Sequence, residues 1–330
     1  MKHSNISVFI PHIGCPNMCS FCNQRTISGT QKAPSAFEVR EICRKAFSEV
    51  ISRSETEIAF FGGSFTAIDR SYMLELLQAV QEFIGDDGFK GIRISTRPDC
   101  INSEILDLLK KYKVTSIELG AQSMCNHVLL ANDRGHTAED VENAGRLIRA
   151  FGFELGLQMM IGLYKSTPDD ELRTFDKIMS IKPDTLRIYP VVILKGTRLG
   201  ELYESGEYEP FDFRKAVELC SLFMEKSEEN GVRVIKAGLH ASEFVEKDLL
   251  GGFYHPAFRE LCESEIYKKK IKSLIGENCS YALISVPNRN LSMAIGQKRS
   301  NIEFFSSIGT HLRIISDKLQ TESLKLIERR

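Results

Sequence analysis

The sequence predicts an α/β protein, a partial (β/α)6-type barrel followed by a small α+β C-terminal domain. Three observations predict it: β-rich runs alternate with amphipathic helical patterns to about residue 240, polar or glycine residues follow five successive candidate strands, and the composition changes after about residue 254. Strand–helix alternation implies parallel strands joined by right-handed crossovers. A doubly wound sheet is the competing architecture, because periodicity alone does not separate the two.

The candidate strands are short apolar or β-branched runs: Ile6–Ile10, Glu57–Phe61, Gly91–Ser95, Ser116–Gly120, Glu154–Met160, Thr185–Pro190 and Val232–Lys236. The candidate helices between them repeat apolar residues at three and four spacing, at about 36–51, 70–84, 102–112, 137–151, 168–181 and 212–230. We therefore expect a barrel domain over residues 1–240 and a small basic domain over residues 254–330.

The overall composition is that of an ordinary globular protein. Its formal net charge is −1 and 26% of its residues are charged, so no global bias toward nucleic acid or membranes is present. The first residues lack the apolar core of a signal peptide, and no run approaches the roughly 18 apolar residues of a membrane span. We expect a cytoplasmic protein without a membrane partner.

A loop over residues 12–24 carries three cysteines, Cys15, Cys19 and Cys22, at C-x3-C-x2-C spacing. Thiolates are soft ligands that suit zinc or iron–sulfur clusters, and three of them leave either kind of centre one ligand short. Structural zinc normally has a fourth protein ligand, whereas a catalytic centre keeps an open position. The spacing therefore predicts a metal centre that binds a further ligand.

Polar or glycine residues follow the first five candidate strands, where a barrel places its chemistry. The Gly62-Gly63 pair, which has no side chains, lets a ligand approach the backbone closely, and Ser64 and Thr66 add hydroxyl groups. The alternative for this stretch is a tight strand-to-helix turn in which Ser64 or Thr66 caps a helix. Later strands end near Gln122 and Gln158. Their shared position predicts one common site.

The cysteine motif, His12-x-Gly14-Cys15-Pro16-x-x-Cys19-x-Phe21-Cys22-Asn23, resembles the radical S-adenosylmethionine (SAM) superfamily. Further stretches resemble the branch of the elongator complex's catalytic subunit: Glu118-Leu-Gly-Ala-Gln122-Ser123, Asp133-Arg134-Gly135-His136-Thr137 and Asp184-Thr-Leu-Arg187-Ile188-Tyr189-Pro190. The resemblance covers about residues 6–240. That subunit carries an acetyltransferase domain after its barrel, and no acetyl-CoA-binding pattern is evident here, so acetyl transfer is not implied.

The resemblance implies that the three cysteines hold a [4Fe–4S] cluster whose fourth iron binds SAM. Reductive cleavage would give a 5′-deoxyadenosyl radical that abstracts hydrogen from a substrate, with a reductant such as flavodoxin or ferredoxin. It further implies cofactor-binding roles for these residues: Gly62, Gly63 and Thr66 around the methionine amino group, Gln122, Arg134 and Gln158 near the ribose and carboxylate, and Phe21 and Ile161 near the adenine. Ser64, whose hydroxyl could bind an amino or carboxylate group, and Ser95, which stands where the family has a glutamate, are further cofactor-binding candidates.

No residue stands out as a catalytic acid or base. Asp99, Glu118 and His240 are candidates, and each is equally well explained by a structural role.

The last 77 residues carry 13 Lys and Arg against 8 Asp and Glu, a net charge of +5. We expect a helix at about 256–274, strands at Tyr281–Val286 and His311–Ile315, and two short helices between the strands. The loop between these helices, Ile295-Gly296-Gln297-Lys298-Arg299-Ser300-Asn301-Ile302, resembles the I-G-x-x-G-x-N-I loop of KH domains, which clamps an RNA backbone. Arg299 replaces the second glycine. Gly296, Lys298 and Arg299 are the RNA-binding candidates, and a small docking domain is the alternative.

Three functions remain open. The leading hypothesis is a radical SAM enzyme that acts on RNA, with tRNA modification as the reaction class. A second keeps the radical chemistry but acts on a small molecule such as a porphyrinogen. A third is a non-catalytic RNA-binding protein with a structural zinc closed by His12 or another histidine. Zinc alone does not explain the glycine turn and the polar strand ends, which favours the first two.

Overall fold

The computed structural model describes residues 4–11, 13–15, 18–30 and 32–330. Its main sheet has seven parallel strands in the order β1-β2-β3-β4-β5-β6-β8. The strands are β1 (Ser4–Ile10), β2 (Thr56–Gly62), β3 (Gly91–Thr96), β4 (Val114–Gln122), β5 (Glu154–Ile161), β6 (Thr185–Pro190) and β8 (Arg233–Ala237). Within the described residues β1 and β8 form the two edges and do not pair with each other, so the barrel is open. The predicted partial barrel is confirmed, and the doubly wound alternative is wrong.

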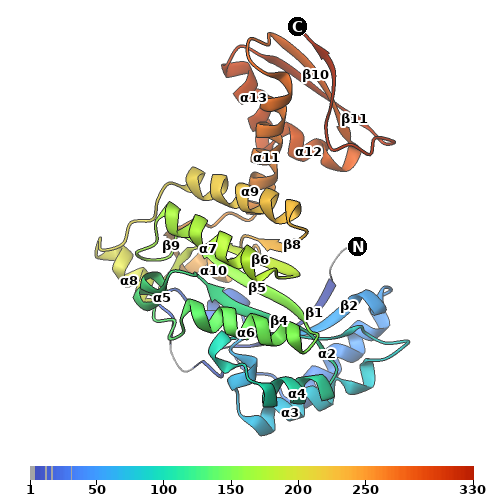
Figure 1. Ribbon diagram of the computed structural model, residues 1–330, viewed down its shortest axis with the longest axis vertical. Coiled ribbons are helices and arrows are strands. Elements are labelled where there is room, and N and C mark those ends of the chain that lie inside the picture. Colours follow the sequence, from blue (N-terminus) through green and yellow to red (C-terminus); the bar gives the residue numbers. More distant parts are fainter. Residues whose placement is uncertain (1–3, 12, 16–17, 31) are drawn as a thin grey trace.

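Helices connect successive strands and cover the outer face of the sheet (Figure 1). They are α2 (Ala36–Glu49), α3 (Arg70–Ala79), α4 (Ser103–Lys111), α6 (Ala138–Ala150), α7 (Pro168–Ile181) and α9 (Phe213–Glu229). Their first residues follow from local sequence. At α7, Thr167 accepts a hydrogen bond from the Asp170 backbone while the Asp170 carboxylate caps Thr167, and Pro168 fills the first helical position, where no amide donor is needed.

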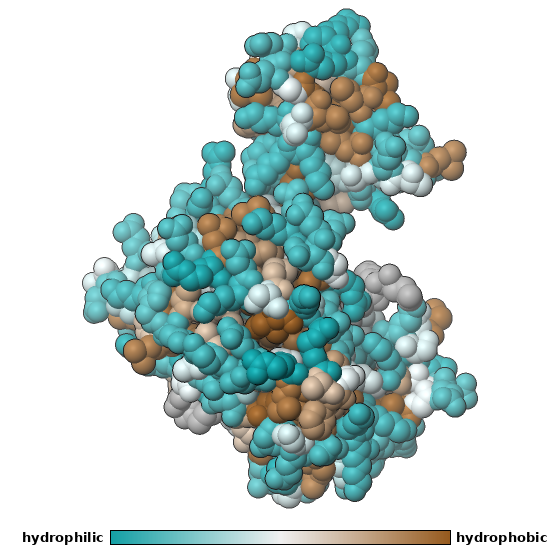
Figure 2. Space-filling model, viewed as in Figure 1, coloured by the Kyte–Doolittle hydropathy of each residue, from teal (hydrophilic) through white to brown (hydrophobic). Residues whose placement is uncertain are grey.

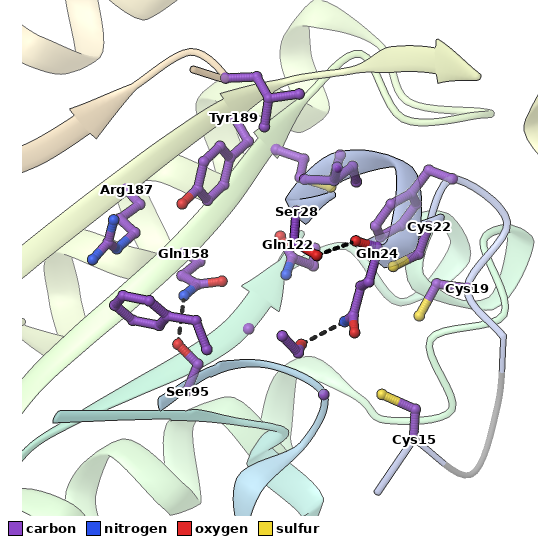
Figure 3. Close-up of a pocket in the computed structure, with 18 of the residues that line it drawn as sticks. Cys15, Cys19, Cys22, Gln24, Ser28, Ser95, Gln122, Gln158, Arg187 and Tyr189 are labelled. Carbon is purple, nitrogen blue, oxygen red and sulfur yellow. Dashed lines mark hydrogen bonds between the residues drawn. The ribbon is translucent and has the colours of Figure 1, made fainter. Parts of the chain in front are cut away.

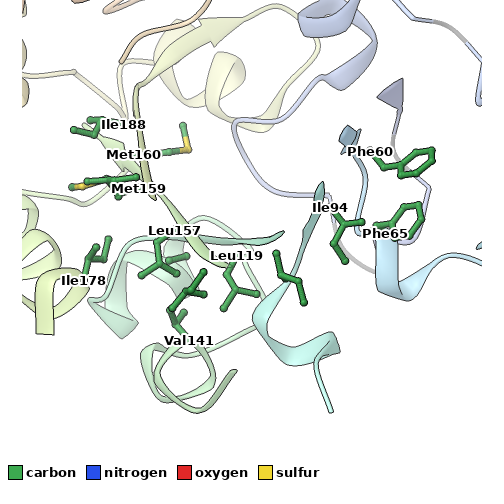
Figure 4. Packing of buried hydrophobic residues seen from close by; sticks show 14 of the residues in the cluster. Phe60, Phe65, Ile94, Leu119, Val141, Leu157, Met159, Met160, Ile178 and Ile188 are labelled. Atoms are coloured by element: carbon green, nitrogen blue, oxygen red, sulfur yellow. The ribbon is translucent and has the colours of Figure 1, made fainter. Parts of the chain in front are cut away.

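The barrel core lies between the sheet and these helices. Figure 4 shows Leu119 and Leu157 from neighbouring strands packed beside Val141 of α6, all buried. Phe175 of α7 stacks on Phe223 of α9 with ring centroids 4.6 Å apart, which joins two covering helices. Since the helices seal this face, the inner face of the open barrel is left for a ligand.

Several short elements were not predicted. They are α1 (Gln24–Ser28), α5 (Asn126–Ala131), α8 (Arg198–Glu204), α10 (Glu243–Asp248), and a two-stranded antiparallel sheet of β7 (Val192–Leu194) and β9 (Leu249–Gly252). Each has seven residues or fewer, too short for a helical or alternating pattern to stand out.

The C-terminal module contains α11 (Phe258–Ile275), β10 (Tyr281–Pro287), α12 (Leu291–Ile295), α13 (Ser300–Ser307), β11 (His311–Asp317) and β12 (Lys325–Arg329). Strand β10 pairs in parallel with β11 and antiparallel with β12. Strand β12 was not predicted. The module stands clear of the barrel and connects to it through α11 (Figure 1).

Helix α11 belongs to two hydrophobic cores. Its first half contributes Phe258 and Cys262 to the barrel core, and its second half contributes Tyr267, Ile271 and Ile275 to the core of the module. The surface between the two lobes is mainly hydrophilic (Figure 2). The side chains of α11 thus pack in the barrel core before the middle of the helix and in the module core after it. The domain boundary that we expect at residue 254 stays a prediction.

Among the described residues, no helix has the length and apolar character needed to cross a bilayer.

Candidate functional site

A cavity of about 440 Å³ opens on the inner face of the barrel, at the carboxyl ends of the strands. Its size lies within the usual range for small-molecule sites. Figure 3 shows Cys15, Cys19 and Cys22 along one side of the cavity, with Arg187 and Tyr189 on the opposite side and Gln158 and Ser95 below them. The carboxyl ends of parallel strands meet at this rim, so segments distant in sequence share one space.

The cysteine loop is tethered to the barrel by hydrogen bonds around Ser20. Its amide donates to the Asn132 carbonyl (3.2 Å), its hydroxyl to the Asn132 side-chain oxygen (2.7 Å), and its carbonyl accepts from the Leu199 amide (2.7 Å). Asn132 is itself fully buried and donates to the Tyr164 carbonyl at 2.9 Å. These contacts fix the position of the loop segment that joins Cys19 to Cys22. Sequence reasoning missed Ser20 and Asn132, whose pairing spans 112 residues.

The glycine turn after β2 packs directly against the cysteine loop. The Gly63 amide donates to the Ile10 carbonyl (2.7 Å) and the Ser64 amide to the Ile13 carbonyl (3.1 Å). A Cβ on Gly63 would lie 1.8 Å from the Ile13 carbonyl oxygen, and one on Gly14 would lie 2.4 Å from the Ser64 carbonyl oxygen. The close approach of the two loops therefore requires glycine at positions 14 and 63, while the expected role of the turn in exposing its backbone to a ligand stays a prediction. Gly62 and Gly63 nevertheless line the cavity.

Arg134 lies beneath the cysteine loop and is 7% exposed. It donates to the Cys19 sulfur (2.9 Å) and to the Gly120 carbonyl (2.7 Å), while its own carbonyl accepts from the Arg97 guanidinium (2.7 Å). Arg97 is in turn held by Asp99, at 2.8 and 2.9 Å. Asp99, a candidate acid or base, thus fixes Arg97. Both residues belong to the polar Thr96-Arg97-Pro98-Asp99 segment at the end of β3.

Two buried polar atoms beside the cavity have no hydrogen-bond partner among the described residues, Gln122 Oε1 and Arg134 Nε. Gln122 also has a φ of +63°, a left-handed conformation that glutamine rarely adopts, next to a register shift between β4 and β5. Buried polar atoms are normally paired, and strained backbone concentrates at functional sites. Both observations fit a polar ligand bound at this point.

The floor of the cavity is a network of buried charges. Glu118 accepts from Arg187 at 2.7 and 2.9 Å and from Arg93 at 3.2 Å, and the Gln158 amide donates to Glu118 (2.8 Å) and to Ser95 (3.2 Å). Burial raises the pKa of Glu118, but Arg187 and Arg93 outweigh it and hold the pKa below its usual value. The carboxylate is therefore a fixed anion, which favours the structural role among the alternatives for Glu118.

The cavity gathers most of the predicted cofactor-binding residues: Phe21, Gly62, Gly63, Ser64, Ser95, Gln122, Arg134 and Gln158. Two do not line it. The Thr66 hydroxyl bonds to Thr96 (2.6 Å) and the Cys100 carbonyl (2.9 Å), behind the turn. Ile161 is fully buried in the core, because alternation along β5 turns Met160 toward the cavity instead. His240, the third acid or base candidate, lines the cavity.

The three thiols form no disulfide and are free to bind a metal. Among the described residues no group of three or more His, Cys, Asp or Glu side chains is gathered closely enough for one metal ion. Burial and the thiols of Cys19 and Cys15 raise the pKa of the Cys22 thiol to about 12. Metals bind the thiolate, and cysteine thiolates are the usual ligands of iron–sulfur clusters, so the chemistry of the three side chains fits a [4Fe–4S] cluster. His12 lies outside the described residues.

The loop that resembles a KH loop joins α12 to α13 in the C-terminal module. Gly296, Lys298 and Arg299 all have positive φ, at +82°, +52° and +66°. Lys298 and Arg299 are exposed, and Asn301 below them donates to the Ser264 carbonyl at 2.9 Å, which fixes the loop on α11. The two cations thus project from a firmly held turn. This loop lies in the module and is not part of the cavity.

Comparisons with known proteins identify the barrel. The "Radical SAM superfamily" model matches residues 9–178, over half of the chain, and the "Radical_SAM C-terminal domain" model matches residues 183–268. A tRNA uridine(34) acetyltransferase of Methanocaldococcus jannaschii is 29% identical over 189 residues, 51% of this chain and 35% of that protein. The chain thus spans about a third of that relative's length.

Two solved structures share the fold. An archaeal Elp3 from Methanocaldococcus infernus superimposes with a TM-score of 0.57 at 20% identity, over 75% of this chain and 62% of that one. Coproporphyrinogen III oxidase from Escherichia coli gives 0.52 at 18% identity, over 69% and 52%. With its fold, its cysteine loop and these matches, the chain belongs to the radical SAM superfamily of enzymes, whose cofactors are a [4Fe–4S] cluster and S-adenosylmethionine.

Proposed function

We propose that this enzyme binds a [4Fe–4S] cluster on Cys15, Cys19 and Cys22, binds SAM in the adjoining cavity, and directs radical chemistry at an RNA substrate, as a tRNA-modifying enzyme. The observation that carries the proposal is that the three thiols and the unpartnered polar atoms of Gln122 and Arg134 border one cavity.

The residues of the cavity have distinct proposed roles. Gly62, Gly63 and Ser64 border the space beside the cysteines, where the amino-acid end of SAM would bind. Gln122 and Arg134 offer the free acceptor and donor for its carboxylate or ribose, with Gln158 and Ser95 on the floor. Phe21 offers an apolar surface to the adenine. The charges of the floor are already paired, so they need not reorganise during the reaction.

When bound and reduced, the cofactor pair supplies a 5′-deoxyadenosyl radical able to abstract hydrogen from a substrate. A one-electron donor such as flavodoxin or ferredoxin is the proposed reductant. The chain's own part is to hold SAM in place and to keep water from the reacting atoms.

The RNA substrate has two supports. The curated relative with 29% identity is a tRNA uridine(34) acetyltransferase, and the C-terminal module exposes Lys298 and Arg299 on a turn of the kind that contacts phosphates. The third hypothesis, a non-catalytic zinc protein, conflicts with membership in a superfamily of enzymes.

The cysteine assignment is tested by single alanine substitutions of Cys15, Cys19 and Cys22. After anaerobic reconstitution, each variant should lose the cluster and the formation of 5′-deoxyadenosine from SAM, because a ligand to iron is removed. Iron and sulfide analysis and chromatography of the products measure both. Cys100→Ala is the matched control, since Cys100 lies outside the loop, and it should retain both properties. Retained 5′-deoxyadenosine formation in the three loop variants would refute the assignment.

The RNA assignment is tested by the double substitution Lys298→Glu and Arg299→Glu. We expect weaker binding of total tRNA, and a salt slope reduced by about 0.9 for each phosphate that the turn no longer binds. Filter binding across a salt titration measures both. The control, Lys318→Glu with Lys325→Glu, makes the same charge change elsewhere on the module. Equal losses of affinity in both double variants would assign the effect to net charge and not to the turn.

A further inference from the structure

Lys236, a cation that lines the cavity, has no hydrogen-bond or ion-pair partner among the described residues. Lys236 lies on β8, on the strand next to Arg187 of β6, and lines the cavity together with Arg187, Tyr189 and His240. The side chain is half-buried. No hydrogen bond or ion pair joins it to any residue in the described part of the chain.

The cationic neighbours of Lys236 are already neutralised. Arg187 holds Glu118 through two hydrogen bonds and stacks on Phe61, with 4.9 Å from its guanidinium carbon to the ring centroid. Arg259 pairs with Glu263 at 2.8 Å. Burial, Arg187 and Arg259 all lower the pKa of Lys236, so its surroundings oppose the charge and supply no carboxylate in return. A partly buried ammonium without a partner is costly unless a ligand supplies the anion.

We propose that Lys236 binds an oxyanion of the substrate, a phosphate or a carboxylate, on the wall of the cavity opposite the cysteine loop. The inference rests on the proposed function, in which SAM occupies the side formed by the cysteines, Gly62, Gly63 and Arg134. The wall of β6 and β8 is then left for the substrate. Tyr189 and His240 lie beside Lys236 on that wall and offer further polar contacts to the same group.

The test measures anion binding by the reconstituted enzyme loaded with SAM. Calorimetric titrations use inorganic phosphate and glutarate as separate probes, on the wild type, Lys236→Met, Lys236→Arg and Lys215→Met. Lys215 is an exposed lysine of α9 and serves as the control. Wild type and Lys215→Met should bind one of the probes, Lys236→Met should lose about tenfold or more in affinity, and Lys236→Arg should retain binding.

Each outcome decides the proposal. Preference for phosphate identifies a phosphate-bearing substrate, and preference for glutarate identifies a carboxylate-bearing one. Equal binding by wild type and Lys236→Met, no binding by the wild type, or a loss in Lys236→Met that is equally a loss of SAM affinity would overturn it. If Lys236→Met does not fold, failure of Lys236→Arg to bind overturns it. Formation of 5′-deoxyadenosine by the wild type is measured separately, so the proposed function can stand or fall independently.

Discussion

Gly63 has no room for a side chain, since any Cβ there would overlap the Ile13 carbonyl oxygen in the cysteine loop. Gly63→Ala should therefore displace that loop and lower the free energy of unfolding by about 1–3 kcal/mol or more. The cluster should be lost together with SAM binding, because Cys15 lies two residues from Ile13. Thermal unfolding and iron content measure the two effects.

Gly85→Ala is the control for this substitution, because no atom lies within 4 Å of a Cβ at Gly85 and its backbone is not left-handed. It should leave both the melting temperature and the iron content close to those of the wild type. A Gly63→Ala protein that keeps its cluster but binds SAM weakly would show instead that the turn acts on SAM alone.

Within the site, the residue types and their strand positions were predictable, but their contacts were not. Arg134 and Cys19 are 115 residues apart, and no local pattern reveals that their side chains meet. The motif predicts Ile161 near the adenine, whereas the alternation of β5 places its side chain in the core and Met160 on the cavity. Lys236 carried no signal, since a lysine at the end of a strand is usually solvated.

The first turn of helix α7 contains a buried carboxylate, Glu171, which accepts from the Gly162 amide (2.7 Å) and the Ser166 hydroxyl (2.8 Å). Burial raises its pKa from 4.5 to about 7. The folded state then holds a proton that the unfolded state has released, so stability falls as pH rises from about 4.5 to about 7. Across this pH interval the free energy of unfolding should fall by roughly 3 kcal/mol.

Glu171→Gln should remove this dependence, because the amide keeps an acceptor oxygen and does not ionise. Relative to wild type, the variant should gain stability steadily as pH rises through the same interval. Urea unfolding at a series of pH values measures the difference. Glu229→Gln, at an exposed position of α9, is the control and should follow the wild-type curve. Parallel curves for Glu171→Gln and wild type would contradict the raised pKa.

Most long helices and strands could be predicted from the sequence, because each has a periodic pattern of apolar residues and residue types that mark where it begins and ends. Helix α7 occupies the residues predicted for it, where Thr167, Pro168 and Asp170 fix its start. Strand β7 illustrates the opposite case. It has three residues and pairs with β9, more than fifty residues further along the chain, so tertiary contact alone defines it.

At the scale of the whole molecule, α11 joins two cores that should unfold separately. Phe258→Ala should destabilise the barrel core by about 3–5 kcal/mol, and Ile271→Ala the C-terminal module by about 2–5 kcal/mol. Hydrogen exchange followed by mass spectrometry should show faster exchange in β6 and β8 for the first variant, and in β10 and β11 for the second.

The two substitutions serve as controls for each other, since both remove a fully buried side chain from the same helix. Faster exchange in both lobes for either variant would show that the two cores form one cooperative unit.

Helix α11 is a single uninterrupted rod of 18 residues, about 27 Å long, shared by the two lobes. Because its first half packs in the barrel core and its second half in the core of the module, the helix fixes the distance between the two lobes. The turn at Lys298 is held on α11 at Ser264, the seventh residue of the helix. If one RNA molecule touches both this turn and the cavity of the barrel, the reacting nucleotide would be selected by its distance from the nucleotide bound at the turn. Lengthening α11 by whole turns between Phe258 and Ser264 would then shift the position that reacts without any change to the chemistry.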